Sequence, residues 1–197
     1  MGLKNPKAKG SSFERDTARE LSLWLSKGER PDLLRRTVLS GGQFTNFAKR
    51  AKYGKSLGEA GDLGPNHPDA QVLTDKVVIE CKHWKVVDFY QVLWRKGLLY
   101  DALMKVKGEG GSIGKSWVLI ARQNNRPTLI FFPVPVFIDA PRPAGGLFIR
   151  PVGRIPAFPH HKVFNGKIYL AHFDDFLTMS PELFINTYAA NSIGIGF

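Results

Sequence analysis

The amino-acid sequence predicts an α/β protein in which helices flank a mixed β-sheet. Residues 11–27 and 88–106 carry apolar side chains at helical spacing, whereas short runs rich in β-branched and aromatic residues occur at 77–82, 116–121 and 128–132. The elements follow the order helix, strand, strand, strand, helix, strand, strand, which is typical of a mixed sheet covered by helices. With 197 residues, the chain can bury one core without disulfides or a structural metal.

Charge and cysteine content narrow the possible partners and compartments. The chain has 28 lysines and arginines against 17 acidic residues, and this net charge of +11 suits a polyanionic partner such as nucleic acid. The single cysteine, Cys81, excludes an intramolecular disulfide and a multi-cysteine zinc site, so we expect a reducing, cytoplasmic compartment. No apolar run approaches about 18 residues and no secretory leader is visible, so we expect neither a membrane span nor export.

The N-terminal part is predicted to carry a basic arm and a helix. Residues 1–10 contain three lysines among glycine and proline and are expected to form a mobile arm. Ser11 or Ser12 can cap a helix that runs to about Lys27, and the Ser11-x-x-Glu14 spacing is that of a capping box. Helix-end hydrogen bonding is therefore a sufficient explanation of Glu14 at this point.

A basic segment follows. Residues 35–40 indicate a short strand, and Ser40-Gly41-Gly42 indicates a tight turn with exposed backbone. From Phe44 to Lys55, apolar residues take helical spacing while cations occupy the opposite side. A charged helix face is usually only solvated, but so dense a group of cations favours a lobe that contacts phosphates. The cations predicted to bind DNA are Lys49, Arg50, Lys52 and Lys55.

Turn and breaker residues define the remaining elements. Pro65 and Pro68 prevent residues 61–73 from forming one continuous strand, and Thr74-Asp75 indicates a turn before a strand at 76–82. Asp88 can cap the second long helix, which a group of glycines ends after Val106. Further along we expect a polar hairpin loop that needs no special function, an irregular layer, a strand and a last helix, at residues 122–126, 141–159, 167–172 and 181–190 respectively.

The run Val77–Lys82 is where the sequence points to chemistry. In a strand, Glu80 and Lys82 lie on one face, while Ile79 and Cys81 lie on the other, in apolar packing. A carboxylate and an ammonium side by side at a strand end can hold a divalent metal and stabilise a charged oxygen. The alternative is a salt bridge on an exposed strand, so the interpretation depends on the surrounding residues.

Four residues could together support phosphodiester cleavage. That reaction, when metal ions assist it, needs converging carboxylates, a path for the attacking water and a cation near the developing charge. One further acid lies in the first helix and another lies ahead of the Val77–Lys82 strand. The candidates are Glu14, Asp62, Glu80 and Lys82.

Four segments carry a resemblance to a known family: Lys9-Gly10-Ser11-Ser12-Phe13-Glu14-Arg15-Asp16, Ser40-Gly41-Gly42, Gly61-Asp62-Leu63 and Val78-Ile79-Glu80-Cys81-Lys82. In these segments the chain resembles the PD-(D/E)XK nucleases, and within them archaeal Holliday junction resolvases and their bacteriophage relatives. The similarity covers roughly residues 9–132 and implies a restriction-endonuclease-like core, which we place at residues 1–138 with the basic arm included. Residues 139–197 lie beyond the similarity, and we expect them to form an irregular C-terminal extension packed on the same domain.

The resemblance also implies roles for single residues. Asp62 and Glu80 would bind Mg²⁺, for which Mn²⁺ would substitute. Glu14 would assist from the helix, and Lys82 would orient or activate water and balance charge at the phosphate. Ser40 falls where such resolvases carry a serine in a loop near DNA. The implied activity is Mg²⁺-dependent cutting of branched double-stranded DNA, with paired symmetric nicks made by a homodimer at four-way junctions and no small-molecule cofactor.

One departure from the family pattern leaves the metal-binding aspartate open. This aspartate usually follows proline, as Asp69 does here, whereas Asp62 follows glycine. A two-residue turn at Thr74-Asp75 would place Asp69 directly across from Glu80. Asp62 matches the Gly-Asp-Leu form of the phage relatives, and we favour it over Asp69.

Two other functions fit the same residues. One is a phage nuclease of this fold that acts on flaps or linear duplex in replication, repair or packaging, because substrate shape is read by the dimer surface and not by the metal site. The other is a non-catalytic DNA-binding protein that has kept the fold. The presence of all four candidate residues argues against this second alternative.

Overall fold

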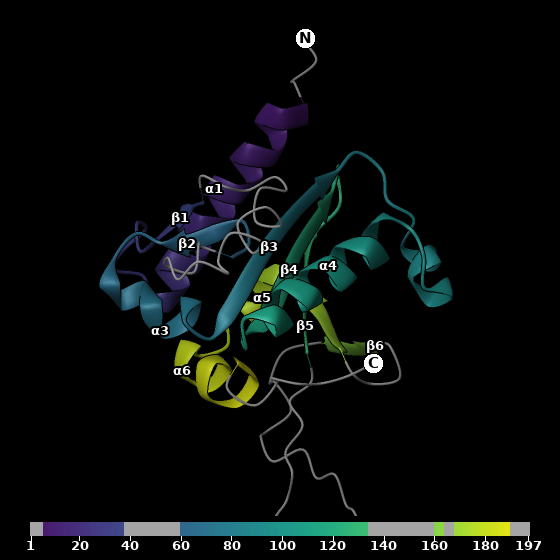
Figure 1. The fold of residues 1–197 in the computed structure, drawn as a ribbon. Helices are drawn as coiled ribbons and strands as arrows, with labels where there is room; N and C mark the ends of the chain where they lie inside the picture. The colour runs from purple at the N-terminus through teal and green to yellow at the C-terminus, as the bar shows by residue number, and fades with distance from the viewer. Residues whose placement is uncertain (1–5, 38–59, 134–159, 164–167, 190–197) are drawn as a thin grey trace, which may run out of the picture.

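Seven strands form one mixed sheet in the computed structural model, which describes residues 6–37, 60–133, 160–163 and 168–189 (Figure 1). β3 and β4 are parallel, and the other neighbouring strands are antiparallel. The predicted α/β class with a mixed sheet is confirmed. In sheet order the strands are β1 (Leu34–Arg36), β2 (Leu63–Pro65), β3 (Val77–Trp84), β4 (Ser116–Gln123), β5 (Thr128–Pro133), β7 (Ile168–His172) and β6 (His160–Val163).

Helices cover both faces of the sheet (Figure 1). On one face, Phe13 and Leu21 of the first helix pack with Ile79 of β3. On the other face, Leu103 of α4 packs with Val78 of β3. Alternation along β3 thus supplies both cores. The helices are α1 (Pro6–Leu25), η2 (Pro68–Ala70), α3 (Gln71–Thr74), η3 (Phe89–Trp94), α4 (Leu98–Ser112), α5 (Phe173–Phe176), α6 (Pro181–Leu183) and η4 (Phe184–Ala189).

The described C-terminal residues complete the core on the α1 face. The predicted strand at 167–172 is confirmed as β7, which pairs with β5 over its full length. Phe176 and Phe184 then pack against Trp24 of α1 and Phe132 of β5, with ring centroids 5.1–5.9 Å apart. These ring contacts join α1 and the described C-terminal helices in one core.

The first helix begins earlier than predicted. It starts at Pro6, so residues 6–10 are helical and not part of a mobile arm. Proline is well accommodated at the first helical position, and the following lysines and alanine favour helix. Ser11 and Ser12 lie in the second turn, where backbone N–H groups already have helical partners, so the predicted capping box with Glu14 is wrong.

The predicted helix from Asp88 to Val106 is two helices. Asp88 does cap the first, η3, because its Oδ1 accepts a hydrogen bond from the Tyr90 N–H at 2.9 Å. The chain then turns through a left-handed Arg95 (φ 55°) and Gly97 (φ 89°) before α4 begins. The glycines after Val106 do not end α4, which continues to Ser112.

Several predictions fall outside the described residues. These are the arm at 1–5, the Ser40-Gly41-Gly42 turn, the basic helix 44–55 and the irregular layer 141–159. The predicted DNA-binding residues Ser40, Lys49, Arg50, Lys52 and Lys55 are therefore not placed by the structure. Within the four described ranges, no helix has both the length and the apolar character needed to cross a bilayer.

Candidate active site

Strand β3 positions the acid and base that the sequence singled out. Glu80 lies on the sheet face that α4 covers and is only 1% exposed. The Lys82 ammonium donates to Glu80 Oε1 at 2.5 Å. Ile79 and Cys81 are buried in the core on the opposite face, as predicted. The alternative interpretation, a salt bridge on an exposed strand, is right about the salt bridge but wrong about the exposure, because the Glu80 carboxylate is buried.

Asp62 is brought to this pair by backbone bonds ahead of β2. Its N–H donates to the Ile79 carbonyl at 2.8 Å, and Gly61 makes the approach possible. Gly61 has φ 85°, and a Cβ there would lie 2.5 Å from the Ile79 oxygen. The buried Asp62 Oδ2 then accepts from the Cys81 N–H at 2.9 Å and from the Lys82 ammonium at 3.2 Å.

Asp69 lies elsewhere. Residues 71–74 form a helix instead of a strand, and β3 pairs with β2 through Leu63 and Ile79. The hairpin register that would have set Asp69 opposite Glu80 is therefore wrong. Asp69 lies in η2, where its side chain is 66% exposed and 3.2 Å from the His67 ring.

Glu14 lies on α1 and forms an ion pair with Arg36 of β1. Its side chain is 12% exposed. Its charge acts on Asp62, where it helps to raise the pKa of that carboxyl group behind larger contributions from burial and Glu80. The structure thus places Glu14 near Asp62 but gives its carboxylate a cationic partner of its own.

Two residues of α4 extend the site beyond the sequence prediction. The Lys105 ammonium donates to Glu80 Oε1 at 2.6 Å and lies 3.6 Å from Glu109 Oε1. The second oxygen of Glu109, Oε2, is buried and has no hydrogen-bond partner among the described residues. The only signal in the sequence is a Lys-Glu pair four residues apart, a spacing so common on helices that it indicates no site by itself.

Burial and close charges act against each other in this cluster. Burial and the nearby Glu80 raise the pKa of Asp62. Burial also tends to raise the pKa of Glu80, but the ammoniums of Lys82 and Lys105 outweigh it, and the net shift is downward. Burial tends to lower the pKa of Lys82, but the carboxylates of Asp62 and Glu80 raise it by more, so the net shift is upward and Lys82 stays charged. Burial raises the pKa of Glu109.

The donor set suits a hard divalent cation. Asp62 Oδ2 and Glu80 Oε1 both face the Lys82 ammonium, so two carboxylate oxygens lie close together. Among the described residues, no group of three or more His, Cys, Asp or Glu side chains lies close enough together to hold a metal ion by itself. Mg²⁺ does not require this, because it is commonly bound by one or two carboxylates together with substrate phosphates and water.

The fold and this cluster define a class of protein. A mixed sheet with helices on both faces, an aspartate ahead of β3 and Glu-x-Lys within β3 are the features of a PD-(D/E)XK nuclease with the restriction-endonuclease-like fold. The chain belongs to the family described as "phage putative PDDEXK endonuclease", whose model matches residues 5–144. No match was found among curated proteins or among solved structures.

Proposed function

We propose that this nuclease is a Mg²⁺-dependent DNA endonuclease that cuts four-way junctions, with Asp62, Glu80 and Lys82 as its catalytic residues. One observation carries the catalytic part of the proposal. Asp62 Oδ2 and Glu80 Oε1 both lie within 3.2 Å of the Lys82 ammonium, in a buried cluster next to the end of β3. This is the arrangement of paired acids and a cation that phosphodiester hydrolysis requires.

Each side chain has a defined task in this proposal. Asp62 and Glu80 would hold the metal ion, which when bound supplies Lewis acidity at the phosphate and acidifies water. The Lys82 ammonium orients the attacking water and balances charge on the phosphate oxygens. Burial of the two carboxylates keeps their charges from being screened by solvent, so each interaction with the substrate is stronger there than at the surface.

The junction substrate is supported by the motif similarity and by charge. Glu14 and Ser40 resemble residues of Holliday junction resolvases, and the Gly-Asp-Leu form resembles that of their phage relatives. The net charge of +11 favours a large polyanion. Symmetric cutting of a four-way junction needs two active sites related by a two-fold axis, so the active species would be a homodimer.

Single-turnover cleavage of an end-labelled four-way junction, with Mg²⁺ and separately with Mn²⁺, tests the site. We expect Asp62→Asn and Glu80→Gln to lose about a hundredfold or more in rate, because each removes a metal-binding charge. Asp69→Asn is the matched control, since its exposed side chain lies away from the site. Equal rates for the Glu80 variant and the parent would contradict the assignment.

Comparison of three substrates tests the specificity. The parent should make paired symmetric nicks in the junction faster than it cuts a flap or a plain duplex. A junction that is bound but uncut, while flaps or duplex are cut, would remove the resolvase assignment and leave the nuclease. Binding supported by Ca²⁺ without any cutting in Mg²⁺ or Mn²⁺ would identify a DNA-binding protein that has lost catalysis.

A further inference from the structure

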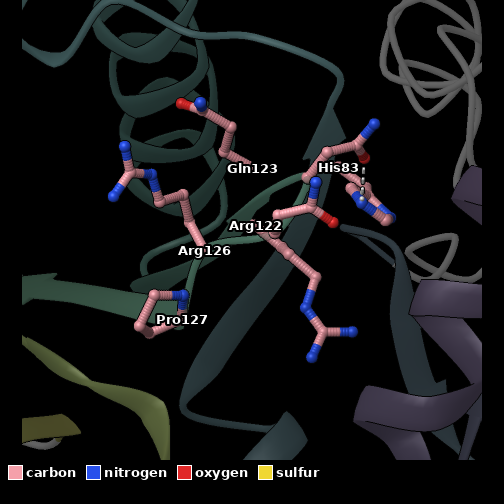
Figure 2. A pocket seen from close by; sticks show the side chains of 7 residues that line it. His83, Arg122, Gln123, Arg126 and Pro127 are labelled. Atoms are coloured by element: carbon pink, nitrogen blue, oxygen red, sulfur yellow. Dashed lines mark hydrogen bonds between the residues drawn. The ribbon is translucent and has the colours of Figure 1, made fainter.

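We propose that the β4–β5 hairpin is a second DNA-binding element, which holds the phosphate backbone beside the cleavage site. The hairpin ends in a polar turn, and its side chains line an open hollow of about 380 Å³ formed by His83 and residues 122–127 (Figure 2). This inference rests on the proposed function, because it takes the substrate to be DNA. It replaces the prediction that this loop needs no special function.

The hollow is cationic and lacks acids. Arg122 and Arg126 are exposed, and neither forms an ion pair within the described part of the chain. Lys9 reaches the hairpin from α1 and donates to Asn124 Oδ1. Among the described residues, no carboxylate lines the hollow, although the charge of Glu20 of α1 interacts with that of Arg122. A surface on which cations outnumber acids is suited to contact with phosphates.

The wall of the hollow is held in place by packing. The Arg122 guanidinium lies over the buried Phe13 ring, 5.6 Å from its centroid, and Phe13 in turn contacts the His83 ring edge-on at 5.3 Å. His83 Nε2 lies 3.1 Å from Asn124 Oδ1, which fixes the two side chains together. An ordered wall binds a ligand with less loss of conformational entropy than a mobile one does.

The hollow is adjacent to the active site along the chain. His83 follows Lys82 directly and is in register with Arg122 across β3 and β4. By alternation His83 and Arg122 lie on the α1 face of the sheet, beside Phe13, whereas Lys82 lies on the α4 face, so the two sites meet only at the strand ends. Duplex DNA carries one charge about every 1.7 Å along its axis. A duplex that has its scissile phosphate at Lys82 and runs across the ends of these two strands would therefore bring further phosphates to the hollow.

The arrangement of the cations favours a polyanion over a small anion. Figure 2 shows the Arg122 and Arg126 side chains leaving the hairpin in different directions. Two guanidiniums that diverge cannot both grip one phosphate, but they can contact separate phosphates of an extended backbone. Free phosphate is accordingly a weak competitor in this proposal.

Binding of a fluorescent duplex by the full-length protein, with Ca²⁺ in place of Mg²⁺, tests the hairpin. Affinity is measured at 50 and 200 mM salt for the parent, Arg122→Ala, Arg126→Ala and Arg126→Lys. The matched control is Lys76→Ala, at the opposite end of β3. Each alanine variant should weaken binding at both salt concentrations, and the ratio of the two affinities should fall by about threefold for each phosphate that the variant no longer binds.

The remaining variants and measurements distinguish an effect on the hairpin from an effect on the active site. Arg126→Lys should recover most of the affinity and Lys76→Ala should match the parent. Cleavage in Mg²⁺ at limiting DNA should slow in the two alanine variants in proportion to their loss of affinity, while Lys76→Ala should cleave like the parent. Arg122→Ala loses packing on Phe13, so a melting curve is needed to test whether this variant is folded. Arg126 is exposed, so Arg126→Ala provides an independent variant.

Three outcomes would overturn the proposal. If both alanine variants bound DNA with the affinity and salt dependence of the parent, the hairpin would not be a DNA-binding element. The proposed function would still stand, provided that the parent cleaves DNA in Mg²⁺. If millimolar inorganic phosphate displaced DNA from the parent but not from the alanine variants, the hairpin would be a small-anion site instead. A parent that neither binds nor cuts DNA would remove both proposals.

Discussion

Glu80 shows how far one side chain depends on its neighbours. Two ammoniums, from Lys82 and Lys105, contact the same carboxylate oxygen at 2.5 and 2.6 Å. Lys82 comes from the same strand, so its proximity follows from alternation alone. Lys105 comes from α4 and is 43% exposed, so solvent screens its attraction to Glu80. A metal ion that binds Glu80 would compete with both.

Replacement of Lys105 tests this competition without relying on catalysis. We expect Lys105→Met to bind Mn²⁺ more tightly than the parent, by up to about fivefold, because the ion no longer displaces a partly exposed ammonium. Lys105→Arg keeps the charge and should bind like the parent. Isothermal titration calorimetry in the absence of DNA measures the difference. Weaker Mn²⁺ binding by Lys105→Met would mean that Lys105 holds Glu80 in its metal-binding position.

At the scale of elements, β3 and α4 define the site between them. β3 lies between β2 and β4, so its backbone is held on both sides while its side chains reach both faces. α4 covers the face that carries Glu80 and contributes Lys105 and Glu109. The rotation of α4 about its own axis therefore decides which of its polar residues join the cluster.

Two glycines of α4 that are two residues apart should respond to alanine in opposite ways. Gly108 is exposed and a Cβ there would meet nothing within 4 Å, so Gly108→Ala should stabilise the protein by about 0.5–1 kcal/mol. A Cβ at Gly110 would lie 2.8 Å from the Lys115 carbonyl oxygen, so Gly110→Ala should destabilise it by about 1–3 kcal/mol. Urea unfolding of both variants measures the two effects. Equal stability of the two variants would show that Gly110 does not pack against the Lys115 carbonyl.

At the scale of the whole molecule, the sheet depends on residues far beyond the nuclease motif. β7 covers the side of β5 that would otherwise be an open edge, and the rings that follow it pack on Phe132. The family match ends at residue 144, before β7. The matched segment thus lacks part of the core that covers β5.

A chain shortened to residues 1–144 should therefore fail to fold cooperatively. Loss of β7 exposes the backbone of β5, and loss of Phe173, Phe176 and Phe184 exposes the aromatic core around Phe132. Thermal unfolding followed by near-ultraviolet circular dichroism should show no transition for the short chain. In the full chain, Phe176→Ala should cost about 3–5 kcal/mol and Phe176→Leu clearly less. A short chain that melts as sharply as the parent would contradict this dependence.

The sequence predicted those features of the fold and the site that depend on local patterns of residues. Alternation placed Glu80 with Lys82 and Ile79 with Cys81, because a strand has a period of two residues wherever it lies. Proline placement correctly excluded a continuous strand over 61–73. Apolar runs located β4, β5 and β7 within a few residues. Asp62 was preferred over Asp69 from a motif resemblance, since no local pattern distinguishes two acids in irregular segments.

Contacts between distant segments were decided only by the tertiary structure. The backbone bond from Asp62 to Ile79 sets the register that carries Asp62 to Lys82 and leaves Asp69 at the surface. Packing of α4 brings Lys105 to Glu80. Packing of α1 replaces the predicted capping role of Glu14 with an ion pair to Arg36. The physical reason is the same in each case: which residues meet depends on how whole elements bury their apolar faces, and that choice minimises the free energy of the entire core and not of any one stretch of sequence.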